Sequence, residues 1–283
     1  MKIILLGTGG PRPDPDRQGS GVVLTDDHNY LLFDAGRGVS TQLVRVGIQP
    51  QQVNPIFITH HHFDHIGNLG DVILSSWNNG RTAPLHIIGP RGTAAIVEAL
   101  LNHVYDADIH FRLTEAARSE SNLPDVKELV TVTDVEPGLV YDQSGWRVFA
   151  EYVEHGHGLG LSLEEWPCLG YRVETPAGIV AISGDMVPCA GLDRLAQGAD
   201  ALVQCCYLAE AEIIDHDTAL VPQHILASSG QVGKIAAQAG VQKLVLTHFR
   251  QKSAVLMQTI AEDVHRDFDG KLFLGEDLME IEV

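Results

Sequence analysis

Four side chains with the chemistry of metal ligands lie within six residues of one another. They are His60, His62, Asp64 and His65, and they directly follow an apolar run that ends at Ile58. Imidazole nitrogens and carboxylate oxygens are common zinc ligands in proteins. A histidine-rich tag or metal-scavenging tract is the competing interpretation, but such tracts lack a preceding strand and an ordered Asp-His pair. The spacing therefore predicts a metal site.

Three further segments place a metal-binding side chain directly after an apolar run. The first contains His155 and His157, of which His155 is the favoured ligand. In the second, Asp185 follows the run 180–182 and a glycine turn, where its two oxygens could bridge two cations; the alternative is an ordinary turn aspartate. In the third, His248 follows the run 244–246, and the alternative is a half-buried histidine. These segments would complete a two-metal centre.

The seven side chains sort into two groups. One ion would be held by His60, His62 and His155, the other by Asp64, His65 and His248, with Asp185 between them. Imidazoles around a zinc leave a position for water, whose pKa falls to about 7, and two ions roughly 3.5–4 Å apart can share one hydroxide. We expect two zinc ions, with Mn²⁺ or Fe²⁺ as alternatives, and hydrolytic chemistry. No Gly-x-Ser-x-Gly motif indicates a serine nucleophile.

Apolar runs bounded by turn residues predict the elements that position these side chains. Strands are expected at Ile3–Leu6, Gly21–Leu24, Tyr30–Phe33, Ile56–Ile58, Leu85–Ile88, Val130–Val132, Arg147–Val153, Leu169–Glu174, Ile179–Ile182, Ala201–Gln204 and Lys243–Thr247. Helices are expected at Val39–Val46, Pro90–Val104, Leu192–Gln197, Ile225–Ala239 and Ala254–Phe268. Thr114–Asp125 reads as a surface loop. The pattern predicts stacked sheets with helices outside, in a single domain spanning residues 1–283.

Composition favours a small substrate over a nucleic acid. The net charge is −18, and the 19 Lys and Arg residues are scattered, whereas backbone phosphates are normally bound by a basic patch. A local patch can nevertheless survive on an acidic protein. Four cysteines without a CxxC pair indicate reduced thiols, and the apolar start at 1–7 is too short for a signal or membrane span. These features predict a cytoplasmic protein with no membrane partner.

With these motifs in order, the chain resembles the metallo-β-lactamase superfamily, and specifically its ribonuclease Z and arylsulfatase-like branch. The likeness rests on the segments Leu5–Gly10, Leu31–Gly36, Thr59–Gly67, Pro167–Arg172, Ser183–Asp185 and Leu246–Phe249. It implies an α+β fold, a four-layer αβ/βα sandwich with the metals at one edge of two sheets. It also implies that Asp34 orients a metal-binding histidine, with a turn aspartate at a strand end as the alternative. Relatives are commonly homodimers.

The resemblance is incomplete near the substrate. His224 falls where ribonuclease Z carries a histidine that protonates the leaving group, and a substrate contact is the alternative role. The glutamate that supports that histidine is missing from the segment 202–207. The segment between His155 and Asp185 is too short for a tRNA-binding arm, and Arg250 preserves one positive charge for a substrate anion.

The leading expectation is a dinuclear zinc hydrolase that cleaves an ester-type bond of a small substrate: a carboxylic ester, lactone, sulfate ester or phosphodiester. Asp64 or His224 would manage the proton. Trp77 and Trp166, with His157 and Arg250, are candidate substrate contacts, although Trp77 is more readily explained as a core aromatic. Alternatives are a tRNA 3′-processing endonuclease, a mononuclear iron persulfide dioxygenase and a degenerate binding protein.

Overall fold

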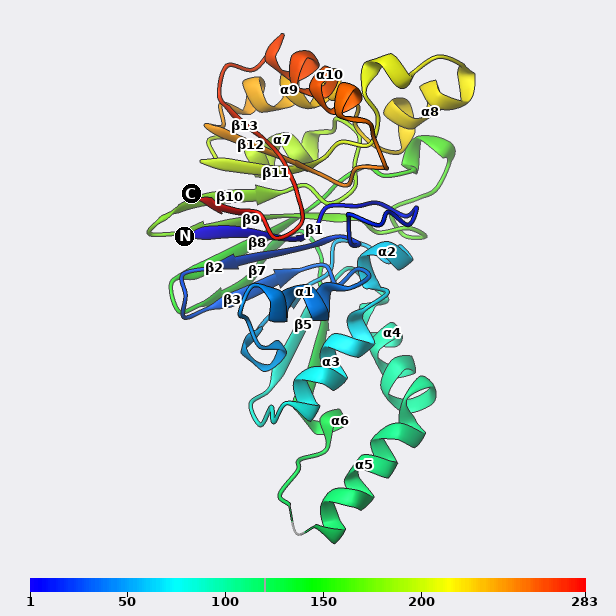
Figure 1. The fold of residues 1–283 in the computed structure, drawn as a ribbon, viewed down its shortest axis with the longest axis vertical. Coiled ribbons are helices and arrows are strands. Elements are labelled where there is room, and N and C mark those ends of the chain that lie inside the picture. Colours follow the sequence, from blue (N-terminus) through cyan, green and yellow to red (C-terminus); the bar gives the residue numbers. More distant parts are fainter. Residues whose placement is uncertain (120) are drawn as a thin grey trace.

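The computed structural model describes residues 1–119 and 121–283, which form two seven-stranded sheets stacked face to face (Figure 1). The first sheet contains, in spatial order, β14 (Glu280–Glu282), β1 (Lys2–Gly7), β2 (Gly21–Thr25), β3 (Tyr30–Phe33), β4 (Ile56–Phe57), β5 (Leu85–Gly89) and β6 (Val130–Asp134). The second contains β13 (Lys271–Leu274), β12 (Lys243–Thr247), β11 (Ala201–Cys205), β10 (Gly178–Ile182), β9 (Leu169–Thr175), β8 (Trp146–Tyr152) and β7 (Gly138–Gln143).

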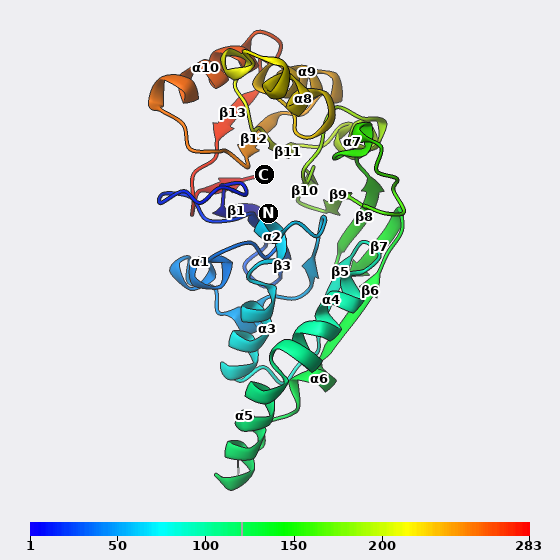
Figure 2. The same ribbon diagram turned by 90° about the vertical axis from the view of Figure 1, so that its right-hand side faces the viewer.

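Helices cover the outer face of each sheet, as both views show (Figures 1 and 2). On the first sheet lie α1 (Val39–Arg45), α3 (Leu69–Asn78), α4 (Thr93–Ala99), which continues as a π-helical turn at Leu100–Val104, α5 (Asp106–Arg118) and α6 (Val126–Leu129). On the second lie α7 (Ala190–Ala196), α8 (His216–His224), α9 (Ser229–Ala239) and α10 (Ala254–His265). The short α2 (Phe63–Ile66) lies where the sheets meet. No helix of the described residues has both the length and the apolar character to cross a membrane.

The apolar side chains form three clusters that match these layers. A cluster that includes Leu5, Phe33, Tyr171 and Val203 fills the space between the sheets. The other two lie between each sheet and its own helices. Strands buried on both faces explain the continuous apolar runs in the sequence. The expected four-layer αβ/βα sandwich is confirmed.

Each sheet is antiparallel on one side and parallel on the other, and the parallel side carries the site. Strands β3 to β6 and β10 to β13 are parallel within their sheets. The carboxyl ends of parallel strands meet at one edge of a sheet, where ligands commonly bind. His60 follows β4, Asp185 follows β10 and His248 follows β12. His155 follows β8, an antiparallel strand of the second sheet.

Several elements differ from the sequence prediction. Strands β7, β13 and β14 were not expected, because β7 is largely exposed and β14 has a single buried apolar residue, Ile281. Helices α3, α5 and α8 were also missed, and α8 has Pro222 inside it. The predicted helix at Ile225 begins instead at Ser229, because Ser228 is in extended conformation and Gln231 accepts a hydrogen bond from its backbone N–H.

The predicted surface loop at Thr114–Asp125 is partly wrong. Helix α5 continues through Arg118, and its first turn carries two acidic residues, Asp106 and Asp108, which favour a helix start. Polar residues in the sequence suggested a loop, but they form the exposed faces of this amphipathic helix. Glu120, within the predicted loop, lies outside the described residues.

Candidate metal centre

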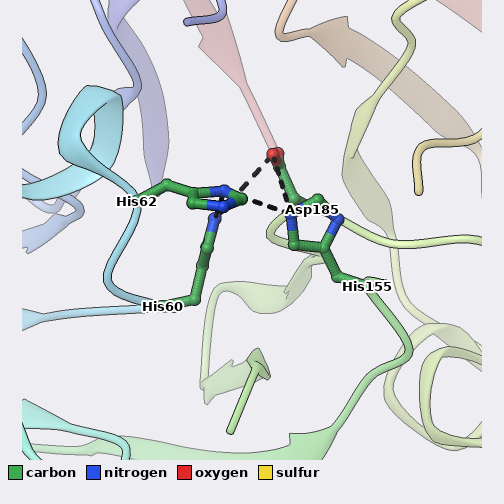
Figure 3. A group of neighbouring side chains, drawn as sticks. All are labelled: His60, His62, His155 and Asp185. Atoms are coloured by element: carbon green, nitrogen blue, oxygen red, sulfur yellow. Dashed lines mark hydrogen bonds and ion pairs between the residues drawn. The ribbon is translucent and has the colours of Figure 1, made fainter. Parts of the chain in front are cut away.

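The first group of side chains brings three histidines and a carboxylate together from three chain segments (Figure 3). His60 Nε2 lies 3.0 Å from His62 Nδ1, and His155 Nε2 lies 3.2 Å from the same atom. Asp185 Oδ2 is 3.9 Å from both His60 Nε2 and His155 Nε2. His61, between two members, turns away and contacts Thr93 Oγ1 at 2.8 Å.

The second group is buried and shares Asp185 with the first. It consists of Asp64, His65 and His248. Asp185 Oδ2 lies 3.5 Å from His65 Nε2 and 3.2 Å from His248 Nε2. Asp64 Oδ2 lies 3.8 Å from His65 Nε2 and 3.2 Å from His248 Nε2. All seven sequence-predicted ligands therefore converge, and one oxygen of Asp185 faces both groups.

These residues fit a divalent cation on three counts. Ligand atoms about 2.1 Å from a tetrahedral zinc lie about 3.4 Å apart, and the observed separations of 3.0 to 3.9 Å bracket that value. His65 Nε2, which faces Asp185, is buried without a hydrogen-bond partner in the described chain, an unfavourable state for a polar atom. A cavity of about 20 Å³ borders the second group, and its lining includes Asp34 and Asp185.

Hydrogen bonds to Nδ1 fix which nitrogen of three histidines faces the site. His155 Nδ1 donates to the carbonyl of Ile225 at 2.6 Å, an oxygen that can only accept. His65 Nδ1 donates to Asp34 Oδ2 at 2.7 Å, and His60 Nδ1 lies 3.0 Å from Thr59 Oγ1. In each case Nε2 is the ring nitrogen that faces the other ligands, as in a metal-binding histidine.

Asp34 and Thr59 form the buried support of this arrangement. The Thr59 backbone N–H donates to Asp34 Oδ1, and its hydroxyl donates to Asp34 Oδ2, both at 2.8 Å. Asp34 and His248 both have φ of 61°, a left-handed conformation that non-glycine residues adopt rarely and mainly at functional sites. Sequence analysis missed Thr59, although its position between an apolar strand and His60 was a usable signal.

The contacts in the loop after β8 favour His155 over His157 as the metal ligand. His157 Nδ1 accepts a hydrogen bond from the His155 backbone N–H at 3.0 Å, and its Nε2 donates to the carbonyl of Trp166 at 2.9 Å. Both ring nitrogens are thus bonded to the backbone, so His157 holds the loop, and the substrate contact expected of it stays a prediction. Trp166 packs its ring 4.7 Å from the ring of His62.

The two groups differ in protonation. Burial and the neighbouring His155 lower the pKa of His62 to about 4, and burial and His65 lower the pKa of His60 well below its usual range. Burial alone would lower the pKa of His65 too, but the carboxylates of Asp185 and Asp34 raise it well above its usual value. Without metal, the histidines of the first group are therefore neutral near pH 7, whereas His65 of the second group holds a proton.

Trp77 and Arg250, two predicted substrate contacts, have partners within the chain. Trp77 is 1% exposed in the core of the first sheet and its helices, where its Nε1 donates to the carbonyl of Pro124 at 2.8 Å. The core alternative is therefore correct. Arg250 pairs with Glu212 through Nη2 at 2.5 Å and Nε at 3.0 Å, so its guanidinium is held in an ion pair within the chain.

His224 lies beside the first group without touching it. Its backbone carbonyl accepts a hydrogen bond from Gly156 N at 2.7 Å, next to His155. Its ring packs on Gly158, where an added Cβ would lie 2.2 Å from Nδ1 of His224. Among the described residues, no hydrogen bond joins the His224 ring to either ligand group.

Comparisons with known proteins were made with the full chain. A model of the beta-lactamase superfamily domain matches residues 29–249. The chain is 35% identical to a protein named ribonuclease Z from Mycobacterium avium (strain 104), over 100% of this chain and 98% of the relative. It is 33% identical to ribonuclease Z from Mycobacterium bovis (strain BCG / Pasteur 1173P2), over 100% of this chain and 98% of that one.

Two solved structures share the fold. A metallo-beta-lactamase fold protein from Bacillus subtilis superposes with a TM-score of 0.74 at 18% identity, covering 100% of this chain and 98% of that one. The short form of human tRNase Z superposes with a TM-score of 0.68 at 24% identity, covering 99% and 98%.

Proposed function

The chain belongs to the metallo-β-lactamase superfamily, and from this premise we propose that it is a tRNA 3′-processing endonuclease of the ribonuclease Z type, in a single domain spanning residues 1–283. The observation that carries the proposal is full-length similarity, at 33–35% identity, to proteins named ribonuclease Z. The chain is a metal-dependent hydrolase by family, and the proposal adds the substrate.

The relatives overturn the expectation of a small ester-type substrate with no nucleic-acid partner. That expectation rested on a net charge of −18, which sums the whole surface. Binding of a phosphate backbone depends on the potential where the substrate lies, and one exposed cation at the site can matter more than distant carboxylates. The overall charge was therefore the wrong quantity for excluding RNA.

We propose two zinc ions as the resident metals. His60, His62 and His155 would hold one, Asp64, His65 and His248 the other, and Asp185 would contact both. When bound, such ions supply Lewis acidity for hydrolysis of a phosphodiester. The donor set of imidazole nitrogens and carboxylate oxygens, with the unpartnered Nε2 of His65, supports this assignment.

The remaining side chains would orient the substrate and move protons. Asp64 is ionised, because a hydrogen bond from His248 and the charge of His65 outweigh burial and lower its pKa, and it can accept a proton from the attacking water. His224, half-buried beside the His155 loop, is the candidate donor to the leaving group. Trp166, partly buried against His62, offers a stacking surface for a base next to the cleaved bond.

The test is cleavage of a precursor tRNA with a 3′ extension by the zinc-loaded protein. We expect a single cut at the 3′ end of the mature tRNA, loss of cleavage in His62→Ala, and retention in His61→Gln. His61 is the matched control, because it lies in the same histidine stretch but turns away from the ligands. Failure of the zinc-loaded wild-type protein to cut the precursor would disprove the substrate assignment.

A further inference from the structure

Arg37, which follows β3, is a half-buried cation. It lies beside Gly10, a residue of the loop that follows β1. Nη2 of its guanidinium donates to the carbonyl of Gly10 at 3.1 Å. The Arg37 carbonyl in turn accepts a hydrogen bond from Gly19 N at 3.0 Å. The first contact holds the Arg37 side chain, and the second holds its backbone, against this loop. The loop runs beside α2 in Figure 1.

Gly10 stands between Arg37 and the second ligand group. A Cβ added to Gly10 would lie 3.0 Å from Cε1 and 3.3 Å from Nδ1 of His248, and 3.4 Å from Cε2 of Tyr207. The Gly10 backbone N–H also donates to the carbonyl of Phe249, the residue after His248, at 3.1 Å. Because Gly10 has no side chain, its backbone lies against the His248 ring. The guanidinium of Arg37 is therefore one residue away from the metal centre.

The Arg37 guanidinium lacks an anionic partner within the described chain. Its Nη1 is buried and makes no hydrogen bond there, and no carboxylate of the described residues forms an ion pair with it. The cations after the last ligand differ, because Glu212 pairs with both Arg250 and Lys252. A buried guanidinium N–H without an acceptor is unfavourable, so Arg37 is suited to an acceptor from outside the chain.

The exposed ring of Phe63 lies next to this guanidinium. The Phe63 ring is 60% exposed although it lies inside the ligand stretch, and Cζ of Arg37 is 6.0 Å from its centroid. Phe63 begins α2, directly before Asp64. The guanidinium of Arg37 therefore contacts both the exposed Phe63 ring and the Gly10 loop, beside the second ligand group.

We propose that Arg37 binds a phosphate group of the substrate at the metal centre and so selects phosphodiesters over uncharged esters; the identity of that substrate rests on the proposed function. A guanidinium presents a planar fork of N–H donors that matches two phosphate oxygens. Arg37 keeps one edge on Gly10 and has Nη1 unused. It is a specificity-determining residue outside the seven ligands.

The test measures binding of inorganic phosphate to the zinc-loaded, full-length protein by calorimetry, in wild type, Arg37→Gln, Arg37→Lys and Arg45→Gln. Arg45 is the matched control, an exposed arginine on α1 whose removal changes the net charge equally. Zinc content and thermal unfolding are measured on each variant. Precursor tRNA cleavage is recorded in parallel, as KM and kcat separately.

We expect Arg37→Gln to weaken phosphate binding about tenfold or more, with zinc content unchanged, and Arg45→Gln to bind like wild type. Phosphate affinity equal to wild type in a folded, zinc-loaded Arg37→Gln would overturn the inference. If that variant does not fold, Arg37→Lys decides: severalfold weaker binding supports bidentate recognition, and unchanged binding contradicts it. Wild-type protein that binds phosphate through Arg37 but does not cut precursor tRNA would sink only the proposed function.

Discussion

The two ligand groups of the metal centre are built from similar side chains but held differently. In the first group, the Nδ1 atoms of His60 and His155 are bonded to uncharged oxygens, those of Thr59 and Ile225. In the second, Nδ1 of His65 is bonded to a carboxylate, Asp34. The histidines of the first group are therefore neutral donors, whereas His65 of the second group carries positive charge until a cation replaces its proton.

This difference suggests that the two sites fill by different rules. Neutral imidazoles bind a cation without releasing a proton, so the metal affinity of the first site depends mainly on the geometry of its ligands. The second site must lose the His65 proton, so its affinity depends on pH and on Asp34. Asp185 is the one residue common to both, with its Oδ2 atom 3.2 to 3.9 Å from four histidine nitrogens.

The largest effect is expected from Asp185→Asn. This variant should weaken metal binding at both sites and so remove the difference between them. The variant places an amide where an anionic oxygen faces four histidines, so both ions should bind more weakly, and cleavage should fall by about a thousandfold. Elemental analysis and precursor cleavage measure the two losses. Asp193→Asn, an exposed carboxylate on α7, is the control and should behave like wild type.

Asp34→Asn should separate the sites. Asp34 bonds a ligand directly only in the second group, through His65, and reaches His60 only through Thr59, so we expect the second ion to bind about 10- to 100-fold more weakly while the first is retained. Stepwise zinc titration, with protein-bound metal counted after dialysis, would show one tight and one weakened site. Equal weakening of both sites would contradict the assignment of Asp34 to one group.

The pH dependence of zinc binding should also differ between the sites. The pKa of His65 is raised, so His65 is protonated around neutral pH without metal, and second-site affinity should rise with pH by up to about tenfold per unit until that proton is lost. The pKa of His62 is lowered to about 4, so first-site affinity should stay level near neutral pH. Calorimetry in buffers of different ionisation enthalpy would count the released protons.

The smallest effect is expected from Tyr171→Phe, which tests the support of the first group. The Tyr171 hydroxyl, from the second sheet, donates to the carbonyl of Ile58 at 2.6 Å, two residues before His60. Its loss leaves a buried carbonyl without that donor and should lower the free energy of unfolding by about 1–3 kcal/mol. Denaturant unfolding measures this change. Zinc affinity at the second site should not change, because Asp34 and Thr59 keep their contacts.

The ligands were predictable from sequence because each follows an apolar strand by a short turn. His60, Asp185 and His248 needed no knowledge of pairing, only the rule that strand ends meet at one edge. Stacked sheets with helices outside followed from the same runs, and the four-layer sandwich followed from the family resemblance. Elements without a continuous apolar run, such as β7 and α5, were missed or read as loop.

What could not be predicted depends on partners distant in sequence. Arg250 looks like a free cation in the sequence, but Glu212, 38 positions earlier, forms an ion pair with it. Trp77 could line a pocket or fill a core, and only the position of Pro124 against its indole decides. The substrate was misjudged for a related reason, since net charge carries no information about where the charges lie.

The last described strand, β14, pairs not with its sequence neighbour β13 but with β1, so that Glu282 lies opposite Lys2. A nascent chain leaves the ribosome from its N-terminus, so the edge of β1 that pairs with β14 stays uncovered until β14 has been synthesised. During translation the exposed edge of β1 would be open to other chains. A chaperone that shields this strand co-translationally would meet a need set by the topology itself.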